Sequence, residues 1–391
     1  MTPAARLQAA IEIVDEVVAA AQAGGAAADT LIARYFKTRR YAGAKDRRAV
    51  RDLAYAAIRR AGERPQSGRA ALIGLAEQRP ELAGLFDGST NGPAPIGQEP
   101  VSPAGIAPAW LEAKLAATLG PDDLPALLER APLDLRVNRL KATREAVLQE
   151  LPDAVPGTLW PDALRLPEGT KVEALPAFVE GRVEVQDEGS QLIAAACAAH
   201  PGALVVDLCA GAGGKTLALA AAMEGQGRLI ACDVDRPRLS RLAPRAERAG
   251  ATFIEMRLLD GGREANALAD LAGQADVVLI DAPCSGTGTW RRNPEARWRL
   301  TPERLERLRA MQAHVLACGA PLVKPGGRLV YAVCSLLDEE GKDRVETFLA
   351  ANPGWEAIDP LSVGLRQGTG RRLTPARDGS DGFFIAALVR T

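Results

Sequence analysis

Residues 204–216 read Leu-Val-Val-Asp-Leu-Cys-Ala-Gly-Ala-Gly-Gly-Lys-Thr, a short apolar run that passes directly into a glycine-rich turn. Such a run is typical of a buried parallel strand, and the glycines let the backbone approach a ligand. Four similar runs follow at residues 228–232, 252–256, 277–280 and 329–333, with helical patterns between them. Strands that alternate with helices favour a sheet covered on both faces, so we predict an α/β fold with a doubly wound, mostly parallel Rossmann-like sheet. A last apolar run, Phe383–Val389, predicts an antiparallel strand near the edge of that sheet.

Upstream of the sheet the pattern is helical. Apolar residues at helical spacing over Arg6–Ala21 and Asp46–Arg60 predict an all-helical N-terminal domain, with a Gly/Pro-rich loop near residues 87–108. An alternating run at Leu135–Leu140, followed by the helical pattern Arg144–Leu151, predicts a small α+β connecting unit. We therefore place the domains at residues 1–130, 131–182 and 183–391.

The composition is that of an ordinary soluble protein. The formal net charge is -1 over 391 residues, and no run approaches the roughly 18 apolar residues that span a bilayer. The first residues lack a basic region followed by an apolar segment, so we expect a cytoplasmic protein without membrane contact. Six cysteines without Cys-x-x-Cys spacing and two isolated histidines argue against a disulfide framework, a zinc site and a Cys/His hydrolase. We expect no metal, no obligate protein partner and a monomer.

Two stretches are strongly basic despite the near-neutral total. Arg34–Arg64 contains eleven Lys or Arg against three acids, and Arg291–Arg309 contains seven against three. The first stretch is equally compatible with a solvated helix face. The second interleaves Trp290 and Trp298 with arginines, a mixture that suits phosphate contact and base stacking. We therefore predict that it contacts a nucleic acid.

Two cysteines follow apolar runs of the predicted sheet. Cys284 lies in Asp-Ala-Pro-Cys-Ser-Gly-Thr-Gly, which follows the run at 277–280, and Cys334 lies in Val-Tyr-Ala-Val-Cys-Ser. Both thiols should therefore emerge at carboxyl ends of parallel strands, where open α/β sheets bind ligands. Two thiols at one rim suggest covalent catalysis with separate roles in attack and release. Cys197, Cys232 and Cys318 are interpreted as ordinary core residues instead.

The glycine-rich turn distinguishes three possible cofactors. A P-loop needs a glycine where Cys209 stands, and a dinucleotide fingerprint needs one where Thr216 stands. What remains is a turn that suits an adenosyl ligand, with Asp233 at the end of the next strand as a carboxylate for ribose hydroxyls. Asp233 and Asp281 have an alternative interpretation as helix caps.

Five motifs together carry a resemblance. They are Asp207–Thr216, Asp281–Gly288, Arg291–Pro294, Pro325–Gly327 and Tyr331–Ser335. They resemble the consecutive motifs of the RsmB/Sun family of S-adenosylmethionine-dependent RNA (cytosine-5)-methyltransferases. The resemblance extends over residues 108–390, with matches at residues 134–138, 185–190 and 380–384. Residues 9–60 resemble the NusB-like helical domain that precedes the catalytic part in the ribosomal RNA members.

The resemblance implies roles for individual residues. Cys334 would be the nucleophile that adds to carbon 6 of cytosine, and Cys284 would serve the release step. Asp281 would stabilise the pyrimidine near the sulfonium of S-adenosyl-L-methionine, and Lys215 would orient a ligand. The remaining cofactor contacts would come from the backbone of the turn, from Asp233 at the ribose and from Asp260 at the adenine. The turn residues are Cys209, Ala210, Gly211, Ala212, Gly213, Gly214 and Lys215.

We therefore expect an enzyme that methylates carbon 5 of a cytosine in RNA, with 16S ribosomal RNA as the expected substrate. The alternatives are a transfer-RNA cytosine-5 methyltransferase and a non-catalytic, RNA-binding assembly factor. The presence of both Cys284 and Cys334 disfavours the non-catalytic alternative. A target base must reach the pocket, so a single-stranded or flipped-out cytosine is expected, with Trp290 or Trp298 stacking on its neighbours.

Overall fold

The computed structural model describes residues 1–391 and divides them into two compact units. One unit, here the helical unit, combines Met1–Arg130 with the separate segment Thr289–Pro302. The other, here the sheet unit, combines Ala131–Gly288 with Glu303–Thr391. None of the helices has both the length and the hydrophobicity required to cross a membrane.

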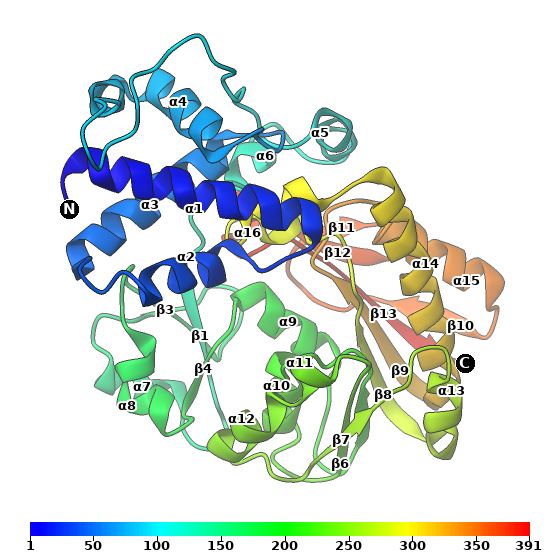
Figure 1. Ribbon diagram of the computed structural model, residues 1–391. Coiled ribbons are helices and arrows are strands. Elements are labelled where there is room, and N and C mark those ends of the chain that lie inside the picture. Colours follow the sequence, from blue (N-terminus) through cyan, green and yellow to red (C-terminus); the bar gives the residue numbers. More distant parts are fainter. The chain divides into compact units, whose positions relative to one another are not determined.

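The helical unit is built around one long helix (Figure 1). Its first helix, α1, begins after Thr2, whose hydroxyl accepts a hydrogen bond from Ala5 N, and ends at Gly24 in the left-handed conformation. Buried side chains of α1 such as Leu7 and Ile13 pack with Ile58 and Leu72. The elements are α1 (Pro3–Ala23), α2 (Ala28–Lys37), α3 (Ala44–Arg60), α4 (Gly68–Gln78), η1 (Pro80–Leu85), α5 (Ala109–Ala116) and α6 (Asp123–Ala126).

The segment Thr289–Pro302 contains the short helices η4 (Thr287–Thr289) at its start and η5 (Pro294–Arg299), and it caps helices of the helical unit. The Arg297 guanidinium donates hydrogen bonds to the carbonyl oxygens of Ile58, Arg59 and Ala61 at 2.7, 3.0 and 2.8 Å. The indole of Trp298 donates to the same Ala61 oxygen at 2.9 Å. The last carbonyls of a helix lack partners within the helix and attract positive charge, so Arg297 stabilises the end of α3.

The same segment caps two other helices with matching charges. Glu295 Oε1 accepts from Ala28 N, at the start of α2, at 2.9 Å. Arg299 donates to the carbonyl oxygens of Gly25 and Ala26, just beyond α1, at 2.7 Å each. An acid thus lies at a helix N-terminus and a base at a helix C-terminus, as the helix dipole favours.

The predicted RNA contacts of Trp290 and Trp298 are therefore wrong. Trp290 is fully buried and Trp298 is 5% exposed, so neither ring can stack on a base. Arg297 is also fully buried, and both terminal nitrogens of its guanidinium donate to backbone carbonyls. A mixture of Trp and Arg suits a nucleic-acid surface, but it suits the capping of buried helix ends equally well. Only the packing of the folded chain distinguishes these two roles.

The sheet unit begins with a small four-stranded antiparallel sheet in the order β2-β3-β1-β4. Asn138, just after β1, donates to the carbonyl oxygens of Gly181 and Ala249 at 2.8 Å each and so joins this sheet to the end of helix α12. The buried Glu184 of β4 pairs with Arg245 of α12 at 2.9 Å. The elements are β1 (Leu133–Val137), α7 (Arg144–Glu150), β2 (Val155–Pro156), β3 (Ala163–Leu166), η2 (Val172–Ala174), α8 (Pro176–Val179) and β4 (Val183–Val185).

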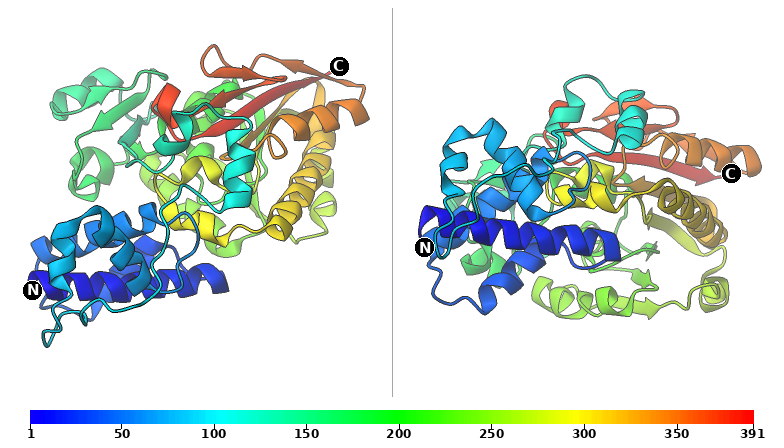
Figure 2. Two further views of the ribbon diagram at one scale, coloured as in Figure 1. Left: turned by 90° about the horizontal axis from the view of Figure 1, so that it is seen from above. Right: turned by 45° about the horizontal axis from the view of Figure 1, so that its top comes forward.

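The main sheet has nine strands in the order β11-β12-β13-β9-β8-β5-β6-β7, with β10 also paired to β13 (Figure 1 and Figure 2). The strands β7, β6, β5, β8 and β9 are mutually parallel, as the sequence predicted. The strands are β5 (Leu204–Asp207), β6 (Arg228–Asp233), β7 (Ile254–Leu258), β8 (Ala275–Asp281), β9 (Val323–Val333), β10 (Trp355–Ile358), β11 (Leu365–Gln367), β12 (Gly370–Leu373) and β13 (Phe383–Arg390).

The antiparallel strand β13 is present but does not lie at an edge. It pairs with β9 on one side and with β12 and β10 on the other. Nearly every residue of β13 is buried, which is the pattern of an interior strand. It lies third from the β11 end of the sheet, near the edge as predicted, and the strands β10, β11 and β12 beside and beyond it were not predicted.

Helices cover both faces of the main sheet. Val205 packs with α9, α10 and α12, whereas its neighbour Val206 packs with α14 and α15 on the other face. This alternation makes every central strand hydrophobic along its whole length. The helices are α9 (Glu188–Ala196), α10 (Gly214–Ala222), α11 (Arg236–Leu239), α12 (Leu242–Ala249), α13 (Glu264–Ala267), η3 (Ala269–Leu271), α14 (Pro302–Gly319), η6 (Ala320–Leu322), α15 (Lys342–Ala351) and α16 (Pro375–Asp378).

Candidate active site

A cavity of about 680 Å³ opens at the carboxyl ends of β5, β6, β8 and β9. Five residues that the sequence singled out line it together: Cys209, Asp233, Asp281, Cys284 and Cys334. Carboxyl ends of neighbouring parallel strands meet at one edge of the sheet, which explains why residues distant in sequence converge here. The volume lies in the range of small-molecule sites in proteins.

The two cysteines lie in direct contact. Ala282 N donates to Ala332 O at 2.9 Å, so β8 and β9 remain in register up to the residues just before the thiols. The Sγ atoms of Cys284 and Cys334 are then 3.3 Å apart. The hydrogen bond with Cys334, burial, and the charges of Cys334 and Glu340 raise the pKa of the Cys284 thiol well above its usual range. The raised pKa keeps the Cys284 thiol protonated near neutral pH.

Lys215 and Asp281 form an ion pair beside the cysteines. Lys215 Nζ lies 2.7 Å from Asp281 Oδ2, and the two side chains are 14% and 29% exposed. Burial alone would lower the pKa of Lys215, but the charge of Asp281 and the hydrogen bond to it raise that pKa. Lys215 therefore stays positively charged, and the charge of Cys334 is among the groups that favour this state.

Asp233 organises the glycine-rich turn. Its Oδ2 accepts a hydrogen bond from Gly211 N and its Oδ1 accepts one from Asp235 N, each at 2.7 Å. Gly213 has a φ of +83°, and a Cβ at this position would lie 2.1 Å from Leu242 Cδ1, so the turn requires glycine. A cavity bordered by a glycine turn and a strand-end carboxylate fits an adenosyl ligand with ribose hydroxyls, and the residues present are compatible with S-adenosyl-L-methionine.

Asp207, the last residue of β5, is hydrogen-bonded to Thr216 at the end of the glycine-rich turn. Its Oδ2 accepts from Thr216 Oγ1 at 2.7 Å, whereas its Oδ1 has no hydrogen-bond partner. Burial raises the pKa of Asp207 to about 7, and the hydrogen bond from Thr216 opposes this shift. Asp207 is therefore partly protonated near neutral pH, and burial likewise raises the pKa of the neighbouring Cys209 thiol.

Some predicted cofactor residues do not line the cavity. Asp260 is exposed, although its neighbours Leu259 and Gly261 are lining residues. The residues Ala210, Gly211, Ala212, Gly213, Gly214 and Lys215 lie behind Cys209 and contribute no lining surface. Their predicted roles at the cofactor stay predictions, and Lys215 reaches the cavity wall through its ion pair with Asp281.

Helix α14 supplies a cavity wall that sequence reasoning missed. Its lining residues are Arg304, Leu308, Met311, His314, Val315 and Cys318. Their spacing follows one helix face, a signal that was available in the sequence but does not identify what the face contacts.

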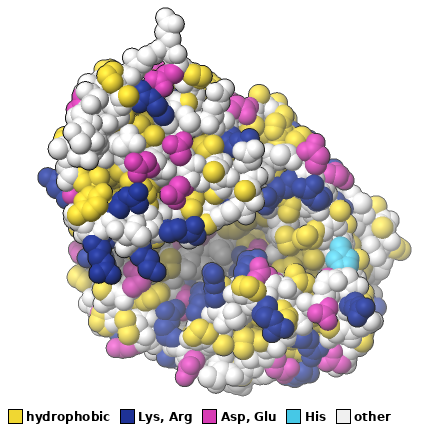
Figure 3. All heavy atoms as spheres, in the orientation of Figure 1, with side chains coloured by type: hydrophobic (Ala, Val, Ile, Leu, Met, Phe, Trp, Pro, Cys, Tyr) yellow, Lys and Arg dark blue, Asp and Glu magenta, His cyan; other side chains and the backbone are white.

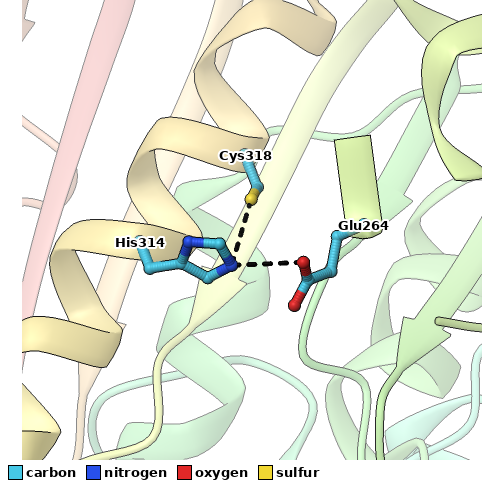
Figure 4. A group of neighbouring side chains, drawn as sticks. All are labelled: Glu264, His314 and Cys318. Carbon is cyan, nitrogen blue, oxygen red and sulfur yellow. Dashed lines mark hydrogen bonds and ion pairs between the residues drawn. The ribbon is translucent and has the colours of Figure 1, made fainter. Parts of the chain in front are cut away.

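Three polar side chains meet on that wall (Figure 4). His314 and Cys318 lie one turn apart on α14, and Glu264 comes from α13. His314 Nε2 is 3.2 Å from Glu264 Oε2 and 3.5 Å from Cys318 Sγ. These distances correspond to a hydrogen bond between His314 and Glu264 and a weak hydrogen bond between His314 and Cys318, and His314 is about half exposed. Cys318, interpreted from sequence as a core residue, instead contributes to the cavity wall.

Comparison with known proteins gives consistent matches. Residues 194–389 match the family model described as 16S rRNA methyltransferase RsmB/F, and residues 107–173 match the RsmF/B-like ferredoxin-like domain. The chain is 36% identical over 329 residues to ribosomal RNA small subunit methyltransferase B of Salmonella enteritidis PT4 (strain P125109), covering 81% of this chain and 75% of that protein.

Solved structures resemble the chain as well. The crystal structure of PH0851 has a TM-score of 0.79 at 25% identity and covers 98% of this chain and 99% of its own. A methyltransferase homologue protein from Pyrococcus horikoshii has a TM-score of 0.63 at 26% identity, with coverage of 72% and 95%.

Proposed function

The chain belongs to the RsmB/F family of 16S ribosomal RNA methyltransferases, whose methyl donor is S-adenosyl-L-methionine, and from this premise we propose that it methylates carbon 5 of a cytosine in 16S ribosomal RNA. The observation that carries the proposal is the pair of thiols 3.3 Å apart on the wall of a cavity that Asp233 also lines. A methyltransferase that acts on an oxygen or an exocyclic nitrogen would have no use for two thiols at this position.

The chemistry explains the need for a nucleophile. Carbon 5 of cytosine is a weak nucleophile, but addition of a thiolate to carbon 6 turns the ring into an enamine that is nucleophilic at carbon 5. S-Adenosylmethionine supplies the methyl group as an electrophilic sulfonium. We assign the bond to carbon 6 to Cys334, because the raised pKa of Cys284 keeps that thiol protonated and leaves Cys334 as the available nucleophile.

The ion pair beside the thiols serves the attack step. Negative charge develops on the pyrimidine as Cys334 adds, and it concentrates at the ring nitrogen. Asp281, on the cavity wall, takes a proton from the Lys215 ammonium group and passes it to that nitrogen, so the ion pair becomes neutral as the ring is protonated. The positive charge of Lys215 also interacts favourably with the negative charge that Cys334 carries when it attacks.

The release step falls to Cys284. Once Cys334 is bonded to carbon it carries no charge and accepts no hydrogen bond from Cys284. The two contributions of Cys334 that raise the pKa of Cys284 then vanish, and this thiol gives its proton to water more easily. The Cys284 thiolate takes the proton from carbon 5, the bond from carbon 6 to Cys334 breaks, and Cys334 leaves as a thiolate.

Asp233→Asn is expected to weaken binding of S-adenosylhomocysteine by roughly 10- to 100-fold, because charged acceptors strengthen hydrogen bonds by about 1.5–3 kcal/mol. Asparagine keeps one oxygen that can accept from Gly211 N, whereas its amide nitrogen cannot accept from Asp235 N, so one of the two hydrogen bonds to the turn is lost. Isothermal titration calorimetry measures the change, with Asp270→Asn, at an exposed surface ion pair, as the matched control. Unchanged affinity, or binding of ATP or NAD in preference to S-adenosylhomocysteine, would contradict this cofactor assignment.

The helical unit presents a basic surface to the RNA in this proposal. Exposed side chains of α2, α3 and the loop between them form it: Arg34, Lys37, Arg40, Lys45 and Arg48. Lys and Arg side chains gather over these helices in Figure 3. Tyr41, in the loop, is 73% exposed and offers an aromatic face among the charges. A NusB-like, RNA-binding role for residues 1–130 rests on this basic surface of α2 and α3.

The triple variant Lys37→Gln/Lys45→Gln/Arg48→Gln should bind ribosomal RNA more weakly and with a shallower salt dependence. The slope of log K against log salt falls by about 0.7–0.9 for each phosphate that the protein no longer neutralises. Fluorescence anisotropy at several salt concentrations measures this slope, and Arg79→Gln, at the end of α4, provides a control for removal of a charge elsewhere. An unchanged slope would show that RNA binds another surface.

The decisive test of the function is methyl transfer from labelled S-adenosylmethionine to total RNA, followed by base-resolution mapping of 5-methylcytosine. Label at one cytosine of 16S ribosomal RNA is the expected result. Label in transfer RNA would replace the substrate assignment, and no transfer to naked RNA or to small-subunit particles would favour a non-catalytic assembly factor.

A further inference from the structure

A buried carboxylate connects the loops that follow the two cysteines. Glu340, which precedes α15, has no exposed surface. Its Oε1 accepts hydrogen bonds from Ser285 N and Gln312 Nε2, each at 2.8 Å. Its Oε2 accepts from the hydroxyls of Ser285 and Ser335, the latter at 2.5 Å. Ser285 directly follows Cys284 and Ser335 directly follows Cys334, so one side chain holds both loops.

Further contacts close this network. The Ser285 hydroxyl lies 3.0 Å from the Ser335 hydroxyl, and Thr287 Oγ1 lies 3.2 Å from the latter. Gln312 of α14 also donates to Pro283 O, on the other side of Cys284, at 3.0 Å. The backbone on both sides of Cys284 is therefore tied to Glu340, directly or through Gln312.

Stability alone does not explain an acid at this position. Removing a carboxylate from water costs several kcal/mol, and a well-packed apolar residue often stabilises such a site more. A carboxylate accepts up to about four hydrogen bonds and donates none, and here four donors converge on it. An amide or hydroxyl at residue 340 would place a donor against one of these donors.

The charge of Glu340 acts on one thiol in particular. It contributes to the raised pKa of Cys284, after the hydrogen bond with Cys334, burial and the charge of Cys334. The positive Lys215 instead interacts with Cys334. Tyr331 also faces this region, and its hydroxyl donates to Glu340 O at 2.7 Å, so it is uncharged and engaged. Opposite charges thus flank the two sulfurs.

We propose that Glu340 is a positioning residue that fixes the distance between the two thiols and keeps their shared proton on Cys284, so that Cys334 is the sulfur that attacks. In this state one of the two thiol protons has passed to water and the other bridges the sulfurs. The free electron pair of Cys334 then forms the bond to carbon 6. The role of Cys334 in attack rests on the proposed function. The position of the proton on Cys284 does not depend on RNA.

The first test needs neither RNA nor turnover. Initial rates of alkylation of Cys284 and Cys334 by iodoacetamide are measured from pH 6 to pH 10 by peptide mass spectrometry, because only thiolates react. In the unaltered protein Cys334 should react faster. In Glu340→Gln the ratio of Cys284 to Cys334 alkylation should rise about tenfold, the equivalent of one pKa unit. A ratio within twofold of the unaltered protein would overturn the proposal.

The matched control is Glu339→Gln, the neighbouring acid, which pairs with Arg309 at 3.7 Å and does not contact the serines. It should leave the alkylation ratio unchanged. Thermal denaturation checks that Glu340→Gln is folded. If it is not folded, Ser285→Ala and Ser335→Ala replace it, because each removes one hydrogen bond to the carboxylate. Each should shift the alkylation ratio in the same direction as Glu340→Gln. No shift in either serine variant would equally contradict the inference.

A second readout separates positioning from support of the fold. Glu340→Gln should lower kcat by roughly 10- to 100-fold and leave KM for S-adenosylmethionine within about twofold, because the carboxylate touches no cofactor-binding group. A rise in KM with unchanged kcat would contradict a role at the thiols. If the proposed cytosine methylation is wrong, the unaltered protein shows no turnover but the alkylation ratios still change in Glu340→Gln. If the role of Glu340 is wrong, turnover is present and the alkylation ratios do not change.

Discussion

Cys334→Ala is expected to abolish methyl transfer, with a rate reduction of roughly 10⁴-fold or more, as for loss of other covalent nucleophiles. Without the thiolate, carbon 6 gains no substituent and carbon 5 stays too weak a nucleophile to attack a sulfonium. The measurement is incorporation of labelled methyl groups into the target RNA under single-turnover conditions. Binding of S-adenosylhomocysteine should change little, because Cys334 follows β9, and β8 lies between β9 and the strand β5 that leads into the glycine turn.

The control for this variant is Cys197→Ala. Cys197 is also a free cysteine, but it is fully buried at the C-terminal end of α9 and does not line the cavity. It should retain most of the activity, with at most a modest loss of stability from the smaller side chain. Appreciable residual turnover by Cys334→Ala would overturn the nucleophile assignment.

Cys284→Ala should trap the enzyme on its substrate. Attack and methyl transfer need only Cys334, so the methylated base forms, but no thiolate remains to take the carbon 5 proton. The bond between Cys334 and carbon 6 then persists, and a protein–RNA adduct that survives denaturation should accumulate while multiple turnover is lost. Denaturing gel electrophoresis with labelled RNA measures the adduct, and mass spectrometry locates it on the peptide that contains Cys334.

The double variant Cys284→Ala/Cys334→Ala is the control for this experiment. It should form no adduct, because the sulfur that makes the bond is gone. Loss of turnover by Cys284→Ala without any adduct would show that Cys284 acts before the methyl transfer, and the release role would then be wrong.

Much of the sheet was predictable from sequence because its signals are local. Each central strand is apolar along its length and each is followed by a helix, so the parallel direction of β5, β6, β7, β8 and β9 could be inferred, whereas their spatial order comes from the structure. The position of Cys284 and Cys334 at one rim follows from that shared direction. Asp233 was predictable in the same way, as the acid that ends the strand after the glycine turn.

Other parts depended on contacts between residues far apart in the chain. Trp298 donates to the carbonyl of Ala61, a partner 237 residues away, and no local pattern distinguishes that role from base stacking. The position of β13 inside the sheet required β10 and β12, two short strands of four residues each. Glu340 was missed because it lies among other acids, although a serine after each cysteine was a visible signal.

The sequence alone determined the positions of strands and helices, the glycine turn and the two cysteine motifs. These features depend on backbone preference and on the spacing of apolar side chains, which act over a few residues. The distance between the two sulfurs, the ion pair of Lys215 with Asp281 and the convergence of four donors on Glu340 exist only in the folded chain. Charge and proximity set which thiol keeps the proton, and both depend on neighbours that folding brings together.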